Sequence, residues 1–177
     1  MIRVQREDFD PGAELDRLLA GKSHIGGAVS FVGLVRDMVG DRVCDKAPGP
    51  ANDQAVGAMT LEHYPGMTEK LLDEIEAEAR RRWPLDASLI VHRYGRLLPG
   101  ERIVLVIAAS AHRAAAFEAA AFLVDWLKSK APFWKHEETP SGGHWVEARA
   151  VDDEAARRWQ ADSGTDGAKR GDFRPPR

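Results

Sequence analysis

The feature that most constrains the fold of this chain is a strand-like run that passes directly into a long apolar helix. The stretch "RIVLVIAAS" (102–110) is rich in β-branched residues, which favour strands. From about Ala111 to Lys130 the apolar residues recur at helical spacing, and Pro132 ends that pattern. The fold must therefore combine a sheet with helices.

Further strands and helices are predicted on both sides of this unit. The strands are expected at 27–36, 57–64, 87–95 and 144–149, and "LPGE" (98–101) predicts a turn between two of the strands. The helices are expected near 13–20, over 68–83 and near 152–160. Because strands and helices do not alternate strictly, the pattern predicts an α+β fold with a mainly antiparallel sheet.

Two segments look irregular. Residues 41–57 hold Pro48, Gly49 and Pro50 among polar residues, which predicts a long flexible loop. Residues 161–177 mix both charges with Gly and Pro, which predicts a disordered C-terminal tail. A chain of 177 residues suits one domain, so we expect 1–160 to form it.

Composition narrows the class of protein. Hydrophobic residues make up 44% of the chain and charged residues 30%, as in globular proteins. A net charge of −3 gives no general attraction to nucleic acid, and the sequence has no apolar run of membrane-spanning length. Cys44 is the single cysteine, which fits a reducing compartment, and the N-terminus does not resemble a signal peptide. We expect a cytoplasmic protein.

The stretch "KSKAPFWKHE" (128–137) crowds three lysines around aromatic residues where the long helix stops. Helical spacing predicts one buried stripe, formed by Phe117, Ala121, Val124 and Lys128. Lys130 then points to the opposite, solvent side. Lys128 either snorkels out at the edge of the stripe, which geometry favours, or lies in a partly desolvated pocket. A solvated helix end that complements the helix dipole is the simpler alternative for all the lysines.

At its other end, the long helix begins with a basic pair. His112 and Arg113 stand beside backbone N–H groups that have no partner within the helix, an arrangement that can bind an anion. A structural histidine followed by an exposed arginine fits the pattern as well. The remaining histidines show no spacing typical of metal ligands, so no metal site is expected: His24, His63, His92, His136 and His144.

Several motifs together resemble one family, the large catalytic subunit of molybdopterin synthase, or MoaE family. They are "LEHYPGMTEK" (61–70), "SAHRAAAFEAA" (110–120) and "LKSKAPFWKHE" (127–137), supported by "FVGLVRD" (31–37) and "HWVEAR" (144–149). The resemblance covers roughly residues 25–159 in the same order. It implies an α/β hammerhead-type fold with one long catalytic helix, and a homodimer within a heterotetramer.

The resemblance also implies the reaction. A small ubiquitin-like sulfur carrier with a C-terminal Gly-Gly thiocarboxylate inserts its tail into the large subunit. There it sulfurates cyclic pyranopterin monophosphate twice, forming the dithiolene of molybdopterin in molybdenum cofactor biosynthesis. Such a sulfurtransferase needs no cofactor and no metal, because the sulfur arrives already activated.

Roles for individual residues follow from the motif positions. The lysine closest to the chemistry falls on Lys128 and the second catalytic lysine on Lys135. The residues implied in substrate binding are Leu34, Val35, Arg36, His112, Arg113, His136, Glu137 and Arg149. Phe31, Phe133 and Trp134 are candidates for the walls of the pocket for the carrier tail, although each could equally belong to the core.

The residue types suit the chemistry. Arginine and histidine side chains can orient an anionic cyclic phosphate. A partly desolvated lysine near other cations has a lowered pKa and can act as general base and then as acid, whereas arginine stays protonated.

Two departures from the family weaken parts of this assignment. Leu34 stands where some relatives carry a basic residue, and the loop 41–57 is longer than usual. Two other classes of function stay open at this point. The chain could be a non-catalytic module that binds the carboxylate terminus of a partner, or a regulator that binds nucleotides or phosphoesters.

Overall fold

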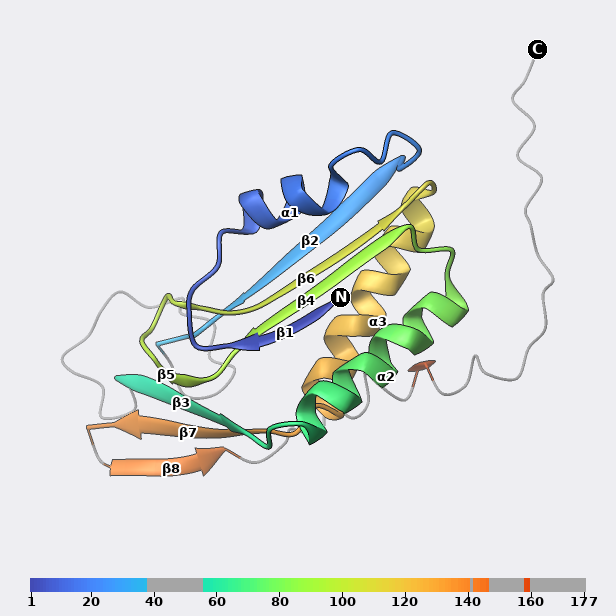
Figure 1. Ribbon diagram of the computed structural model, residues 1–177. Coiled ribbons are helices and arrows are strands. Elements are labelled where there is room, and N and C mark those ends of the chain that lie inside the picture. Colours follow the sequence, from blue (N-terminus) through green and yellow to red (C-terminus); the bar gives the residue numbers. More distant parts are fainter. Residues whose placement is uncertain (38–55, 141, 147–157, 160–177) are drawn as a thin grey trace, which may run out of the picture.

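The computed structural model describes residues 1–37, 56–140, 142–146 and 158–159 (Figure 1). The principal elements in these ranges are, in chain order, β1 (Ile2–Gln5), α1 (Pro11–Leu19), β2 (Gly27–Leu34), β3 (Ala58–His63), α2 (Met67–Arg82), β4 (Ala87–Arg93), β5 (Gly95–Leu97), β6 (Arg102–Ser110), α3 (Arg113–Ser129), β7 (Phe133–Thr139) and β8 (Gly142–Val146). This α+β composition confirms the predicted fold class.

The strands form two four-stranded sheets rather than one. The first has the order β1-β4-β6-β2, with β1 parallel to β4 and the other pairs antiparallel. The second has the order β5-β3-β7-β8 and is antiparallel throughout. The pairing is therefore mainly antiparallel, as predicted. Three strands that the sequence analysis did not identify, β1, β5 and β7, take part in these sheets.

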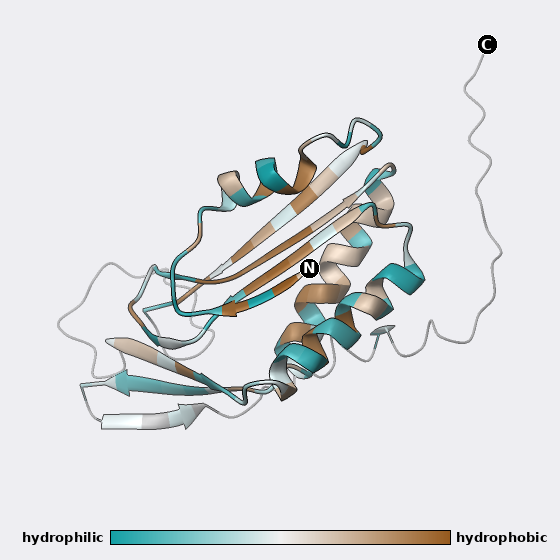
Figure 2. Ribbon diagram, viewed as in Figure 1, coloured by the Kyte–Doolittle hydropathy of each residue, from teal (hydrophilic) through white to brown (hydrophobic). Residues whose placement is uncertain are grey.

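Helices cover both faces of the first sheet (Figure 1). Helix α1 packs on one face, where Phe9, Leu89, Leu105 and Ile107 form a buried cluster. Helices α2 and α3 pack on the other face, against Ile90 and Val106 among others. Figure 2 shows the result, with hydrophobic residues along β4 and β6 and hydrophilic residues on much of α2.

Helix α3 buries a different face from the predicted one. Its buried side chains are Ala115, Ala116, Ala119, Ala120, Phe122, Leu123 and Leu127. Phe117, which was expected in the buried stripe, is 64% exposed, and Lys128 is exposed too. The predicted stripe was wrong because alanines line several faces of this helix, so that spacing alone does not select one. The larger Phe122, Leu123 and Leu127 fix the orientation by packing against the first sheet and α2.

Some predictions fall outside the described residues. These are Cys44, Arg149, the tail 161–177, residues 41–55 of the expected loop, and most of the expected helix 152–160. Residues 158 and 159 are described and are helical. Within the described ranges, none of the helices is both long enough and apolar enough to span a bilayer.

Candidate active site

The predicted site residues that the structure describes divide into two groups at opposite ends of α3. Arg113 is the first residue of this helix and Lys128 lies in its last turn. At 1.5 Å per residue, the fifteen positions between them span about 22 Å. The helix runs back along the sheet, because Ala119 and Ala120 form one cluster with Ala108 near the end of β6, whereas Leu127 belongs to the cluster against which Val104, near the start of β6, packs. A small substrate therefore cannot contact both groups within one chain.

The first group lies where β6 turns into α3. His112 is the N-cap residue, with an extended backbone and no capping hydrogen bond from its side chain. Its backbone N–H donates to Ser110 Oγ at 3.2 Å, and Ser110 Oγ donates to the Pro84 carbonyl at 2.8 Å. The His112 and Arg113 side chains are exposed, and the first turn holds no acidic residue. The helix start is thus positive and open to an anion.

Two further residues shape this helix start. Asp86 Oδ2 accepts the backbone N–H of Ala111 at 2.8 Å, and Asp86 Oδ1 lies 3.3 Å from His24 Nε2. Gly26 lies so close to the same turn that a Cβ there would be 2.3 Å from the Ala111 carbonyl oxygen. The turn before His112 is therefore held from two sides, which fixes the direction in which α3 begins.

The second group begins at the end of α3. Lys128 and Lys130 are both exposed, so burial does not separate them as the sequence analysis expected. Lys130 is the C-cap residue, and its backbone N–H donates to the Trp126 carbonyl at 2.8 Å. Strand β7 starts three residues further on, and it brings Lys135 into the same region of the fold.

Strand β7 sends alternate side chains to opposite faces of the second sheet. Phe133, Lys135 and Glu137 pair with His63, Leu61 and Met59 on the inner face, where Leu61 and Met59 are buried. Trp134 and His136 lie on the outer face, Trp134 with half of its surface exposed. The His136 ring packs against Trp145 with centroids 5.1 Å apart.

This alternation separates the residues predicted for the carrier-tail pocket. Phe133 lies inside and Trp134 outside, so that in a single chain they do not line one pocket. The predicted pair His136 and Glu137 is divided in the same way. Sequence proximity was misleading here because the segment was not identified as a strand.

The segment that follows β2 lies near the second group, which we call the lysine group after Lys128 and Lys135. Val35 is buried in one cluster with Leu61 and Leu97 of the second sheet. Leu61 pairs with Lys135, so the exposed Arg36 that follows Val35 lies at this end of the molecule. Leu34 is exposed as well. Phe31 lies further back on β2, opposite Val106, and is partly exposed.

The structure adds residues that the sequence analysis did not select. His92 of β4 is buried, and its ring stacks on Phe133 with centroids 3.6 Å apart and planes 11° apart. The His63 ring lies 6.2 Å from Phe133 and 4.4 Å from Tyr94. The pKa of His92 is lowered to about 4, chiefly by burial, and the nearby Lys135 and His63 act in the same direction. The sequence signal that could have indicated His92 is a single histidine at the end of the apolar strand segment "LIVHR".

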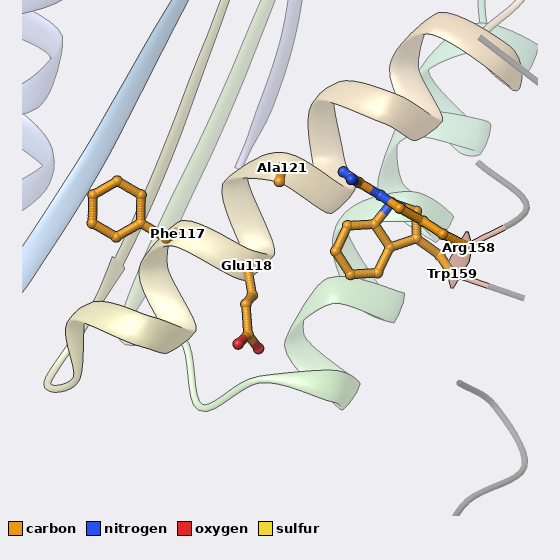
Figure 3. A pocket seen from close by; sticks show the side chains of 5 residues that line it. All are labelled: Phe117, Glu118, Ala121, Arg158 and Trp159. Carbon is orange, nitrogen blue, oxygen red and sulfur yellow. The ribbon is translucent and has the colours of Figure 1, made fainter. Parts of the chain in front are cut away.

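A hollow on the outer side of α3 is not part of either group. It measures about 410 Å³ and is lined by Phe117, Glu118, Ala121, Arg158 and Trp159 (Figure 3). Trp159 closes one side, where its Nε1 donates to Asp125 Oδ2 at 2.8 Å. None of the residues predicted for catalysis or substrate binding lines this hollow.

The chemical capacity of the two groups differs. The lysine group has two primary amines and a guanidinium, and Lys135 lies near the buried ring of His92, which suits proton transfer beside a negatively charged reactant. The helix start provides backbone N–H groups with an imidazole and a guanidinium, which suits a phosphate. Among the described residues, no three His, Cys, Asp or Glu side chains gather as metal ligands.

Comparisons with known proteins agree on one family. The chain matches the family model described as MoaE protein over residues 4–130. A molybdopterin synthase catalytic subunit from Mesorhizobium japonicum is 51% identical over 92% of this chain and 94% of its own length. The protein of the same name from Pseudomonas aeruginosa is 54% identical over 90% of this chain and 98% of its own.

A solved structure agrees as well. The molybdopterin biosynthesis MoaE protein from Burkholderia ambifaria MC40-6 superposes with a TM-score of 0.72 at 49% sequence identity. The match covers 90% of this chain and 97% of the other. The two-sheet arrangement is thus shared with a protein of that name.

Proposed function

Because this chain belongs to the MoaE family, we propose that it is the catalytic subunit of a molybdopterin synthase. It transfers two sulfur atoms from the thiocarboxylated C-terminus of a small sulfur-carrier subunit to cyclic pyranopterin monophosphate. The product is the dithiolene of molybdopterin. The observation that supports this proposal is the pairing of Lys135 with Leu61, because Leu61 shares a buried cluster with Val35, the neighbour of Arg36. Lys128 lies only five residues before the start of β7.

In this proposal the two lysines move protons. Lys128 extends from the last turn of α3 and Lys135 from the inner face of β7, so that the two amines approach a common reactant from two directions. Opening the cyclic phosphate and adding sulfur at two adjacent carbons both need a proton donor and acceptor beside a developing negative charge. Lys128 is exposed in the single chain. A bound substrate and carrier tail would remove water from it.

The distance along α3 bears on the oligomeric state. His112 and Arg113 can bind the substrate phosphate only if they stand near a lysine group, and their own chain keeps them about 22 Å away. A two-fold dimer resolves this, because each helix start can face the lysine end of the other copy. We therefore propose a homodimer in which each site takes its lysines from one chain and its helix-start cations from the partner chain.

The small carrier completes the site. Its extended Gly-Gly end needs a narrow path to the lysines, since a side chain at either position would keep the terminal sulfur from the substrate. Phe133 on the inner face of β7 is the wall that the geometry supports, whereas Trp134 on the outer face can contact only the body of a partner. The name "catalytic subunit" in the relatives supports the existence of a second subunit.

Reconstitution tests the proposal directly. The purified chain is incubated with cyclic pyranopterin monophosphate and a thiocarboxylated carrier, and molybdopterin is measured. The same carrier ending in an ordinary carboxylate is the control, and a carrier without its last two glycines tests tail insertion by loss of complex on size-exclusion chromatography. Binding of the cyclic phosphate without product in any combination would favour the phosphoester-binding alternative. A cytoplasmic location stays a prediction.

A further inference from the structure

The unexplained feature nearest the lysines is the buried imidazole of His92. It stands in β4, a strand whose residues are buried along its whole length. Apolar side chains such as Leu89, Ile90 and Val91 fill the same strand. A leucine at position 92 would pack there without the free energy that burying an imidazole costs. The choice of a histidine therefore calls for a reason beyond packing.

Its hydrogen bond fixes the state of the ring. His92 Nδ1 lies 2.9 Å from the Arg93 carbonyl oxygen, which can only accept, so Nδ1 carries the proton. Because burial lowers the pKa of His92 to about 4, the ring is neutral at physiological pH. Nε2 then holds the lone pair, and the ring adds a dipole but no charge to its surroundings. The titratable groups that face it are Lys135 of β7 and His63 of β3, the latter with Nε2 3.6 Å from Glu69 of α2.

The ring also fixes where β7 begins. Phe133 lies flat on His92 and is the first residue of β7, which only three residues separate from the end of α3. Lys135 follows Phe133 by two positions on the same inner face, about 7 Å along the strand. The stack therefore holds Phe133 in place, and the position of Phe133 determines where the Lys135 side chain points. We propose that His92 is a positioning residue for Lys135, acting through its stack on Phe133.

This inference rests on the proposed function, because it assigns Lys135 a place in the reaction. Two substitutions at position 92 distinguish the effect of a flat aromatic ring from the effect of side-chain volume. His92→Phe keeps a flat ring on Phe133, whereas His92→Leu keeps apolar bulk without that ring. Leu89→Ala is the matched control, since Leu89 lies in the same strand but faces α1 across the other side of the sheet.

One readout does not depend on activity. Lysines of the folded chain are labelled with an amine-reactive reagent for short times, and the labelling rate of Lys135 relative to Lys130 is read by mass spectrometry. We expect His92→Leu to change this ratio about threefold or more and His92→Phe to keep it near wild type. Leu89→Ala should lower the melting temperature and leave the ratio unchanged.

The second readout is the steady-state kinetics of sulfur transfer. His92→Leu should lower kcat about tenfold with KM for the cyclic phosphate within about twofold, because misplaced catalytic groups slow the chemical step. His92→Phe should recover most of that loss. A wild-type ratio and kcat in folded His92→Leu would overturn the inference, as would the same losses in Leu89→Ala. If the wild type makes no molybdopterin, the proposed function fails while the labelling ratio still tests His92.

Discussion

Asp8 accepts a hydrogen bond from Nε of Arg102 at 2.9 Å, which ties the start of the chain to the first residue of β6. A second contact joins the same carboxylate to Arg102 Nη2, and Arg93 Nη1 lies 3.6 Å away. The hydrogen bonds from Arg102 hold the pKa of Asp8 at about 2, below its usual 3.8. The ion pair thus favours the folded state wherever Asp8 is ionised.

The first prediction follows from the sign of that shift. Because folding lowers the pKa, the stabilisation is complete above about pH 4 and is lost as the pH falls toward 2. Asp8→Asn should therefore lower the free energy of unfolding at pH 7, by roughly 1 kcal/mol or less since the pair is half exposed. Urea unfolding at pH 7 and pH 2.5 should show the difference shrinking in acid. Glu7→Gln, at the exposed neighbouring carboxylate, is the control and should show no such trend.

The second prediction separates the two lysines at the end of α3. Lys128→Ala should lower sulfur transfer by tenfold or more, since general acid–base groups contribute roughly 10²–10⁴-fold. Lys130→Ala should be nearly silent. Both side chains are exposed, so neither change should move the melting temperature by more than a degree or two. Equal activity losses in the two variants would remove the special role of Lys128.

The third prediction tests the shared site. Lys128→Ala and Arg113→Ala proteins are unfolded together and refolded as a mixture at equal concentration. In a site built from two chains, each mixed dimer holds one intact site and one doubly altered site, so roughly a quarter of wild-type activity should return. Activity is measured below KM, where loss of substrate binding is visible. If the mixture is no more active than the average of the two separate variants, each site is contained in a single chain.

The fourth prediction concerns the C-terminal boundary of the domain. Trp159 packs edge-on against Trp83 and Phe122, and its carbonyl oxygen accepts a hydrogen bond from Arg82 Nη1 at 2.8 Å. Deleting 161–177 should leave stability and activity near wild type, whereas deleting 158–177 should cost about 2 kcal/mol or more of stability. Thermal unfolding of the two truncated proteins decides between these outcomes. A large loss in the shorter deletion would show that the tail itself docks.

The sequence predicted the elements best where local pattern and tertiary environment agree. Strand β6 has the predicted bounds, 102–110, and α2 begins and ends within one residue of the prediction. Strand β7 was missed because Lys135 was grouped with Lys128 and Lys130 at the end of the long helix. Its pairing with β3, some seventy residues earlier, stabilises a strand that the local composition does not indicate.

The site was less accessible to sequence reasoning than the fold. Helical spacing placed Lys128 on a buried stripe, but Phe117 and Lys128 at the two ends of that stripe are exposed. His92 belongs to no motif, and its significance depends on Phe133, forty-one residues later, lying on its ring. The family resemblance indicated candidate residues one by one. Their division between the two ends of α3 required the three-dimensional structure.

The number of residues in the connection between α3 and β7 matters for the proposed function. The direction of the Lys128 side chain depends on its position around α3, and that of Lys135 on its position along β7, where alternate residues face opposite sides. Ala131 and Pro132 lie in the short connection between the two elements. Adding one residue there would turn β7 over, so that Lys135 faced solvent while Trp134 took an inward position. Such an insertion would preserve every side chain of the proposed site and still dismantle it. The connection should therefore tolerate many amino-acid replacements but very few insertions or deletions.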